Sequence, residues 1–420
     1  MNNTMLTNKK RNPAELEIDL FCKGMRIHPN CDLENDARDF SRTRAGLGSG
    51  LELCIPGKHK IWMNVPALEP FAETSPYLLT KVNSHYRLLH EPDGIVYDVE
   101  LPKEPHWYIE KTASGVKMRE IGVLQGTYLG IYIGPKCAFW NVTPQENCLF
   151  CTTGLNVGES ERAKKTVGEV VETAKAAKEE SGITLVHINT GFHNFRELEL
   201  CLPFVKALKE KVGVLVGVQA LPALDDTLYD QLKDMGCDHV SFCFELFNPE
   251  YFKQYLPGKE KHFGQESFFK AMEYTSRLFG KGRVSGEIIA GIEPIEDTLR
   301  AIDYITGIGA FPTVCIFRPL KGSQMENAPP PSYEDMRRVF QYVYESCMKN
   351  DIPMGIAPNI EVSLVVQPTD TAYLAPHTFE SFWYQTKLSL MRQAAKPLIR
   401  RSMCPHIIQS DIAHSFADME

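Results

Sequence analysis

The stretch TYLGIYIGPKCAFWNVTPQENCLFC, residues 127–151, decides how the rest of the chain is interpreted. Its first part, from Thr127 to Gly134, is rich in β-branched and aromatic residues, which predicts a buried β-strand. Its second part is a loop that holds three cysteines, with ten residues between the first two and two between the last two: Cys137, Cys148 and Cys151. A cysteine-rich loop therefore follows directly after a strand.

Five further strand patterns follow this loop, and helical patterns separate them. The strands are expected at residues 183–191, 212–220, 239–245, 283–291 and 312–320. In the first connection, Thr166 and Glu169 form a capping-box pattern and Gly182 ends the helix. Strands that alternate with helices predict βαβ units and a parallel sheet. The predicted fold class is α/β, a partial (β/α)6 TIM-like barrel over residues 126–325.

Two flanking segments differ from this core in their patterns. Residues 1–125 contain many Pro and Gly and short strand-like pieces, so we expect an N-terminal module that is β-rich or irregular. A Pro run at 329–331 precedes an amphipathic pattern at 332–350. We therefore expect residues 326–420 to form a C-terminal helical extension.

Composition and charge exclude several classes of protein. With 43% hydrophobic and 23% charged residues, the chain has globular rather than disordered composition. The net charge of −8 provides no cationic field for a phosphate backbone, which argues against a nucleic-acid partner. The N-terminus has no apolar signal segment, and no apolar run approaches the roughly 18 residues of a membrane span. We therefore expect a cytoplasmic protein with no membrane partner.

Twelve cysteines are many for such a compartment, and they indicate metal or redox chemistry. Three thiolates in one loop can converge on one centre, and a Cys-x-x-Cys pair is the local arrangement of zinc and iron–sulfur sites. A structural zinc takes four protein ligands, and no fourth Cys or His stands at a usual spacing. We expect the other nine cysteines to be ordinary core residues.

In this loop and the strands after it, the chain resembles the radical S-adenosylmethionine (radical SAM) superfamily, in particular its biotin-synthase-like barrels. Phe150 matches the aromatic residue that precedes the last cluster cysteine, although the Cys-x10-Cys-x2-Cys spacing is longer than the usual one. Asn189-Thr190-Gly191 stands where the family binds the amino group of the methionine moiety. The ending Phe317–Ser323 is similar to the Pro-x-x-Gly-Thr ending of those members.

Two further strand ends carry the resemblance. Glu245 is placed to contact the ribose or the methionine part of the cofactor. The segment Gly286–Glu293, which includes Ile289 and Gly291, looks like the Gly-x-Ile-x-Gly-x-x-Glu segment beside adenine. A weaker likeness is to a little-characterised bacterial radical SAM group found with nitrilase-type genes.

The resemblance implies two cofactors and a reaction class. Cys137, Cys148 and Cys151 would hold a [4Fe-4S] cluster whose open iron binds S-adenosylmethionine. An electron from an external flavodoxin- or ferredoxin-like donor would release a 5′-deoxyadenosyl radical that abstracts hydrogen from a small-molecule substrate. The candidate catalytic residues are Gln219, Glu287 and Arg318, because polar residues at the carboxyl ends of barrel strands contact substrate or support residues that do.

Two other classes stay open at this point. The loop can instead staple a non-catalytic iron–sulfur or zinc protein that acts as a binding module. The chain can also use S-adenosylmethionine as a polar methyl or aminocarboxypropyl donor. The sequence does not identify the substrate or the outcome of the reaction.

Overall fold

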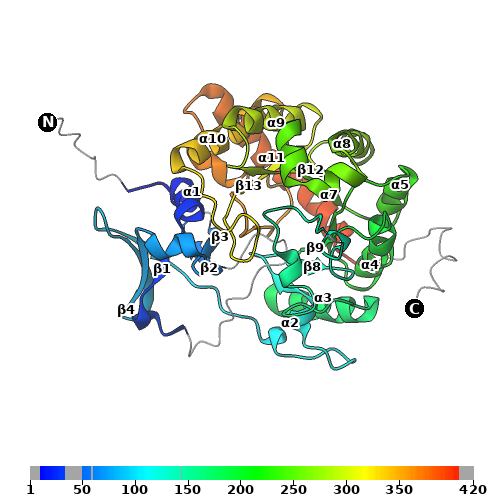
Figure 1. Cartoon of the computed structure of the whole chain (residues 1–420), viewed down its shortest axis with the longest axis horizontal. Helices are drawn as coiled ribbons and strands as arrows, with labels where there is room; N and C mark the ends of the chain where they lie inside the picture. Colours follow the sequence, from blue (N-terminus) through cyan, green and yellow to red (C-terminus); the bar gives the residue numbers. More distant parts are fainter. Residues whose placement is uncertain (1–9, 34–49, 58–59, 143, 406–420) are drawn as a thin grey trace.

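A curved sheet with helices packed around it forms the centre of the molecule (Figure 1). The structure is a computed structural model that describes residues 10–33, 50–57, 60–142 and 144–405. The sheet has seven strands in the order β13-β12-β11-β10-β9-β8-β7. Six of them pair in parallel and in chain order: β8 (Leu129–Tyr132), β9 (Leu185–Asn189), β10 (Leu215–Gln219), β11 (His239–Glu245), β12 (Val284–Ala290) and β13 (Phe311–Ile316). β7 (Val123–Leu124) adds antiparallel to β8.

Helices connect the parallel strands. They are α3 (Val167–Ser181), α4 (Glu197–Lys211), α5 (Thr227–Asp234), α8 (Gln265–Phe279) and α9 (Ile295–Gly307), with two short helices inserted after β11, α6 (Pro249–Tyr255) and α7 (Pro257–His262). The capping box at Thr166 and Glu169 is present, and Gly182 ends α3 in the left-handed conformation. The predicted partial (β/α)6 barrel is confirmed.

The N-terminal module is β-rich, as expected. It contains α1 (Pro13–Lys23), β1 (Arg26–Ile27), β2 (Gly50–Ile55), β3 (Ile61–Pro66), β4 (Tyr77–Val82), β5 (His85–His90), β6 (Ile95–Val99) and α2 (Met118–Ile121), with 3-10 turns at Pro29–Cys31, Pro70–Thr74 and His106–Tyr108. One sheet has the order β1-β4-β5-β6, and β2 pairs with β3 in a separate hairpin. The domain limits at 125 and 325 stay predictions, since one buried hydrophobic cluster runs through all three segments.

The C-terminal extension is helical, with α10 (Tyr333–Lys349), a 3-10 turn at Asp370–Leu374 and α11 (Phe379–Ser402). It covers the end of the barrel at which the strands begin. Asn359 donates to the carbonyl of Gly182, which precedes β9, at 2.9 Å. Lys209, near the end of α4, donates to the carbonyl of Ser402 at 3.1 Å. The cysteine loop follows the opposite, carboxyl end of β8, so α11 and this loop lie at opposite ends of the barrel.

One segment of the extension also contacts both edges of the curved sheet. Val362 forms a β-bridge with Gly126, beside β8, and the carbonyl of Leu364 accepts a hydrogen bond at 3.5 Å from Arg318, which follows β13. No helix within the described residues is long and apolar enough to cross a membrane.

Candidate active site

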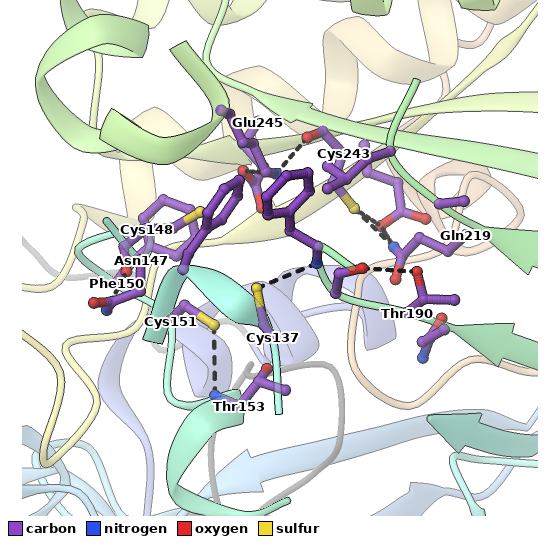
Figure 2. A pocket seen from close by; sticks show the side chains of 18 of the residues that line it. Cys137, Asn147, Cys148, Phe150, Cys151, Thr153, Thr190, Gln219, Cys243 and Glu245 are labelled. Atoms are coloured by element: carbon purple, nitrogen blue, oxygen red, sulfur yellow. Dashed lines mark hydrogen bonds and ion pairs between the residues drawn. The ribbon is translucent and has the colours of Figure 1, made fainter. Parts of the chain in front are cut away.

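The three loop cysteines line one cavity of about 140 Å³ at the carboxyl ends of the strands (Figure 2). Cys137 comes five residues after β8 ends, and Cys148 and Cys151 enter the cavity wall from the far part of the loop. The thiols surround the cavity. Among the described residues, no three Cys, His, Asp or Glu side chains form a group that could hold a single metal ion.

Backbone amides point at two of the sulfurs. The N–H of Phe192 donates to Cys137 Sγ at 3.3 Å, and the N–H of Thr153 donates to Cys151 Sγ at 3.4 Å. Burial raises the pKa of Cys137 to about 11 and also raises the pKa of Cys148 and of Cys151. A metal centre would reverse this, because a coordinating thiol is deprotonated and amide donors stabilise the resulting thiolate.

The long spacer between Cys137 and Cys148 is held against α7. The carbonyl of Glu146 accepts from the N–H of Gly258 at 3.0 Å, and its carboxylate pairs with His262 at 3.0 Å and with Lys261. Phe139 stacks on Phe192 with 4.6 Å between the ring centroids. The spacer between Cys137 and Cys148 therefore forms a strap that packs against α7. The three cysteines line one cavity although this spacer is long.

The turn after β9 passes close to the cysteine loop. Asn189, Thr190 and Gly191 all line the cavity. A Cβ atom at Gly191 would lie 2.5 Å from the Cβ of Cys137 and 2.6 Å from the hydroxyl of Tyr132, closer than Cβ atoms approach other heavy atoms. Glycine is therefore required at this position to let Cys137 reach the cavity wall.

Glu245 enters the cavity from an irregular strand end. The pairing of β11 with β12 shifts register between Cys243 and Glu245, and Glu245 has a φ of 65°. A bulge of this kind re-aims a side chain, and a left-handed non-glycine residue stores strain that clusters at functional sites. Glu245 meets Lys259 from α7, whose Nζ lies 2.5 Å from the carboxylate and 2.6 Å from the carbonyl of Cys243.

Lys259 is not among the candidates that the sequence provides. The side chain is 7% exposed and lines the cavity. Burial alone would lower the pKa of Lys259, but the neighbouring Glu245 carboxylate raises it above the ordinary value for lysine. Lys259 therefore stays an ammonium and places a fixed positive charge beside the thiols.

Three polar side chains from adjacent strands meet deeper in the cavity. Cys243 Sγ accepts from the amide of Gln219 at 2.8 Å and donates to the carboxylate of Glu287 at 3.1 Å, and the same Gln219 amide also donates to Glu287 (Figure 2). Burial raises the pKa of Glu287. No Lys, Arg or His nitrogen of the described chain lies within 4.0 Å of this carboxylate.

The nine cysteines outside the loop were expected to be core residues, and the structure agrees for seven of them. Seven of the nine are buried: Cys22, Cys31, Cys54, Cys201, Cys237, Cys315 and Cys347. Cys404 is exposed, and Cys243 lines the cavity, so the prediction that these two are core residues was wrong. Cys315 is buried and also contributes to the cavity wall.

The other sequence candidates fall into two groups. Phe150 and Ile289 contribute apolar wall to the cavity. Gly291 and Arg318 are not among the lining residues: a Cβ atom at Gly291 would meet the ring of Pro331, and Arg318 lies over the ring of Phe21 at 4.6 Å. The proposed roles of these two residues stay predictions.

No protein-family model matches the chain. Bacteriochlorophyllide c C-7(1)-hydroxylase from Chlorobaculum limnaeum, a curated relative, is 30% identical over 104 residues, which are 24% of this chain and 26% of the relative. The match thus spans about a quarter of either protein.

Solved structures resemble the chain at lower identity. One is HydG, a maturase of the [FeFe]-hydrogenase, with 14% identity and a TM-score of 0.43 over 68% of this chain and 71% of HydG. Another is a radical SAM methyltransferase from Sphaerobacter thermophilus, with 15% identity and a TM-score of 0.42 over 64% of this chain and 75% of that protein. A radical SAM enzyme is thus among the solved proteins that the chain resembles. At these TM-scores the likeness assigns no reaction.

Proposed function

We propose that the chain is a radical SAM enzyme in which Cys137, Cys148 and Cys151 hold a [4Fe-4S] cluster. The observation that carries this proposal is that one loop supplies three thiols to one cavity, two of them with backbone amide donors. When bound, the cluster and S-adenosylmethionine would supply a 5′-deoxyadenosyl radical that abstracts a hydrogen atom from the substrate.

The donor set suits this cluster. Each iron of a cubane takes its own cysteine, which fits three thiols placed around a cavity instead of at one point. Three cysteines would leave one iron of such a cluster without a protein ligand, so that it would be free to bind the amino and carboxylate groups of S-adenosylmethionine. The amides of Phe192 and Thr153 would stabilise the thiolates, because hydrogen bonds to sulfur tune such clusters.

Residues around the thiols would bind and orient S-adenosylmethionine. Asn189 and Thr190 offer amide and hydroxyl groups beside Cys137, and Glu245 offers a carboxylate whose position Lys259 fixes. Phe150 and Ile289 supply apolar wall for an aromatic base. These side chains would also exclude water from the reacting atoms.

The deeper group of Gln219, Cys243 and Glu287 would hold a polar part of a small-molecule substrate. The three side chains come from adjacent strands and line the cavity at their carboxyl ends, where substrates of barrel enzymes bind. The reaction also needs one electron from outside, for which we propose a flavodoxin- or ferredoxin-like donor.

Anaerobic reconstitution of the full chain with iron and sulfide tests the proposal. The wild type should hold about four irons and form 5′-deoxyadenosine from S-adenosylmethionine when reduced. Cys137→Ser, Cys148→Ser and Cys151→Ser should each lose both properties, whereas Cys404→Ala, at an exposed cysteine remote from the cavity, should keep them.

Other outcomes would assign the chain to a different class. One zinc and no iron would contradict the proposal and identify a stapled binding protein. A methyl or aminocarboxypropyl group transferred from S-adenosylmethionine, without 5′-deoxyadenosine, would identify a polar transferase. Four irons with no cofactor cleavage under any reductant would leave a non-catalytic iron–sulfur protein.

A further inference from the structure

The outward face of α11 exposes a group of large apolar side chains. Each of its members is more than half exposed: Phe379, Phe382, Trp383, Leu390 and Leu398. Since a helix repeats every 3.6 residues, Phe379, Trp383 and Leu390 fall on one side of it. Monomeric proteins seldom expose apolar side chains in such groups unless the surface contacts something.

The opposite face of the same helix is anchored, which fixes the direction of the exposed one. Tyr384 donates to the carbonyl of Ile352 at 2.5 Å, and Ser381 shares a hydrogen bond of 2.8 Å with Tyr344. Leu388, on the same side of the helix, is buried. α11 therefore has an apolar side that packs against the rest of the protein and a second apolar side that the described residues leave exposed.

Basic residues accompany the exposed apolar face. Within Phe379–Ser402 there are five basic residues and one acidic residue, in a chain whose net charge is −8. Lys387 pairs with Asp351. The other four are exposed and have no carboxylate within 4.0 Å among the described residues: Arg392, Lys396, Arg400 and Arg401. Local positive charge in an acidic protein favours an anionic partner.

We propose that this face of α11 binds the surface of an anionic lipid bilayer. The aromatic and leucine side chains would enter the boundary between headgroups and acyl chains, and Lys396, Arg400 and Arg401 would contact lipid phosphates. Arg392 donates to the carbonyl of Gly355 at 2.8 Å on the anchored side of the helix and takes no part. Aromatic and leucine residues combined with Lys and Arg on one helix are the features of helices that lie in a membrane interface. A surface contact of this kind needs no membrane-spanning segment, so it revises the sequence-based expectation of no membrane partner.

Two other partners for the exposed face of α11, a second copy of the chain and an electron donor, agree less well with the structure than a bilayer does. A symmetric contact with a second copy would bring two α11 helices of the same positive charge together, which is unfavourable. An electron donor would need to approach the cysteine loop, but α11 lies at the other end of the barrel, as its contact with Lys209 shows. An anionic bilayer would bury the apolar side chains and would also attract the basic residues.

Vesicle binding by the full chain tests the proposal, and it does not depend on the proposed enzymatic function. Vesicles of phosphatidylcholine with phosphatidylglycerol should sediment the protein, and vesicles of phosphatidylcholine alone should sediment at least about tenfold less. Binding should fall as salt rises, because salt screens surface charge. Of the four tryptophans, Trp383 alone is more than half exposed, so its fluorescence should shift to the blue on binding.

Variants assign the binding to this face. Phe382→Ser with Trp383→Ser should reduce vesicle binding at least about tenfold, with an unchanged melting temperature. The matched control, Ile109→Ser with Leu224→Ser, removes two equally exposed apolar side chains elsewhere and should bind as the wild type does. The proposal would be overturned if the wild-type protein did not bind anionic vesicles, or if the Phe382/Trp383 double variant bound them as strongly as the wild type does. A concentration-dependent dimer abolished by the same variant would also overturn it and assign the face to a second copy.

Discussion

The Nζ atom of Lys259 lies 2.5 Å from the carboxylate of Glu245, and the two side chains are 7% and 13% exposed. This ion pair joins α7 to the irregular end of β11, beside the three thiols. α7 also supports the spacer of the cysteine loop through Gly258 and Glu146. One buried pair thus connects the loop that would hold the cluster with the strand end that would hold the cofactor.

Lys259→Met should lower the free energy of unfolding by about 3 kcal/mol, because it leaves the Glu245 carboxylate buried without a partner. Adding Glu245→Gln should restore most of this loss. Urea denaturation of the cofactor-free chain measures both. Lys270→Met is the control, since its pair with Glu266 is exposed and should contribute less than about 1 kcal/mol. Equal effects of Lys259→Met and Lys270→Met would contradict the assigned role.

Gly191→Ala should at least halve the iron bound after reconstitution, because its Cβ atom would occupy the space of the Cys137 side chain. Iron and sulfide analysis, with the visible absorbance of the cluster, measures the effect. Gly307→Ala is the matched control: a Cβ at this helix position meets no atom within 4 Å, so iron content should stay at the wild-type value. If Gly191→Ala bound as much iron as the wild type, the turn after β9 could move away from the cysteine loop, and glycine would not be required at this position.

Local patterns were sufficient to predict the barrel and the cysteine loop. The strands from β8 to β13 are short apolar runs bounded by helical periods, and both signals depend only on neighbouring residues. Lys259 could not be found in this way. Its partner lies fourteen residues earlier, and their contact depends on how the insertion after β11 folds back onto the barrel.

The structure also differs from the sequence-based expectation at Cys243 and Arg318, and each difference has a physical reason. Cys243 of β11 pairs in register with Glu287 of β12, and this register depends on how the two strands align, which neither strand pattern alone predicts. Arg318 follows β13, which is the edge strand of the sheet. The end of an edge strand borders the N-terminal module, and Arg318 accordingly packs on Phe21.

Glu52→Gln should change how stability depends on pH. Burial raises the pKa of Glu52 to about 7, although hydrogen bonds from Ser363 and Gly126 oppose the shift. Because folding favours the protonated carboxyl, Glu52 should lower the free energy of unfolding as pH rises from its ordinary pKa of 4.5 to about 7, with no further change above that. The difference between wild type and Glu52→Gln, measured by urea denaturation at several pH values, isolates this group.

The same comparison with Glu100→Gln provides the control, because Glu100 lies on the surface of the N-terminal module and pairs with Lys60 at 2.6 Å in solvent. If the Glu52→Gln curve ran parallel to that of the wild type between pH 4.5 and 7, Glu52 would ionise near its ordinary pKa of 4.5 in the folded protein, and the assigned burial effect would be wrong.

The strap between Cys137 and Cys148 should depend on the charges of Glu146 and Lys261. Glu146→Lys would place two ammonium groups together and push the strap from α7, so iron content after reconstitution should fall. The double variant Glu146→Lys with Lys261→Glu restores opposite charges and should recover much of the iron. Glu296→Lys, which breaks an exposed pair with Arg338 on α9 and α10, should have no effect. A double variant as poor in iron as the single one would mean that the Glu146 position, and not the ion pair, determines how the strap closes on the cluster cysteines.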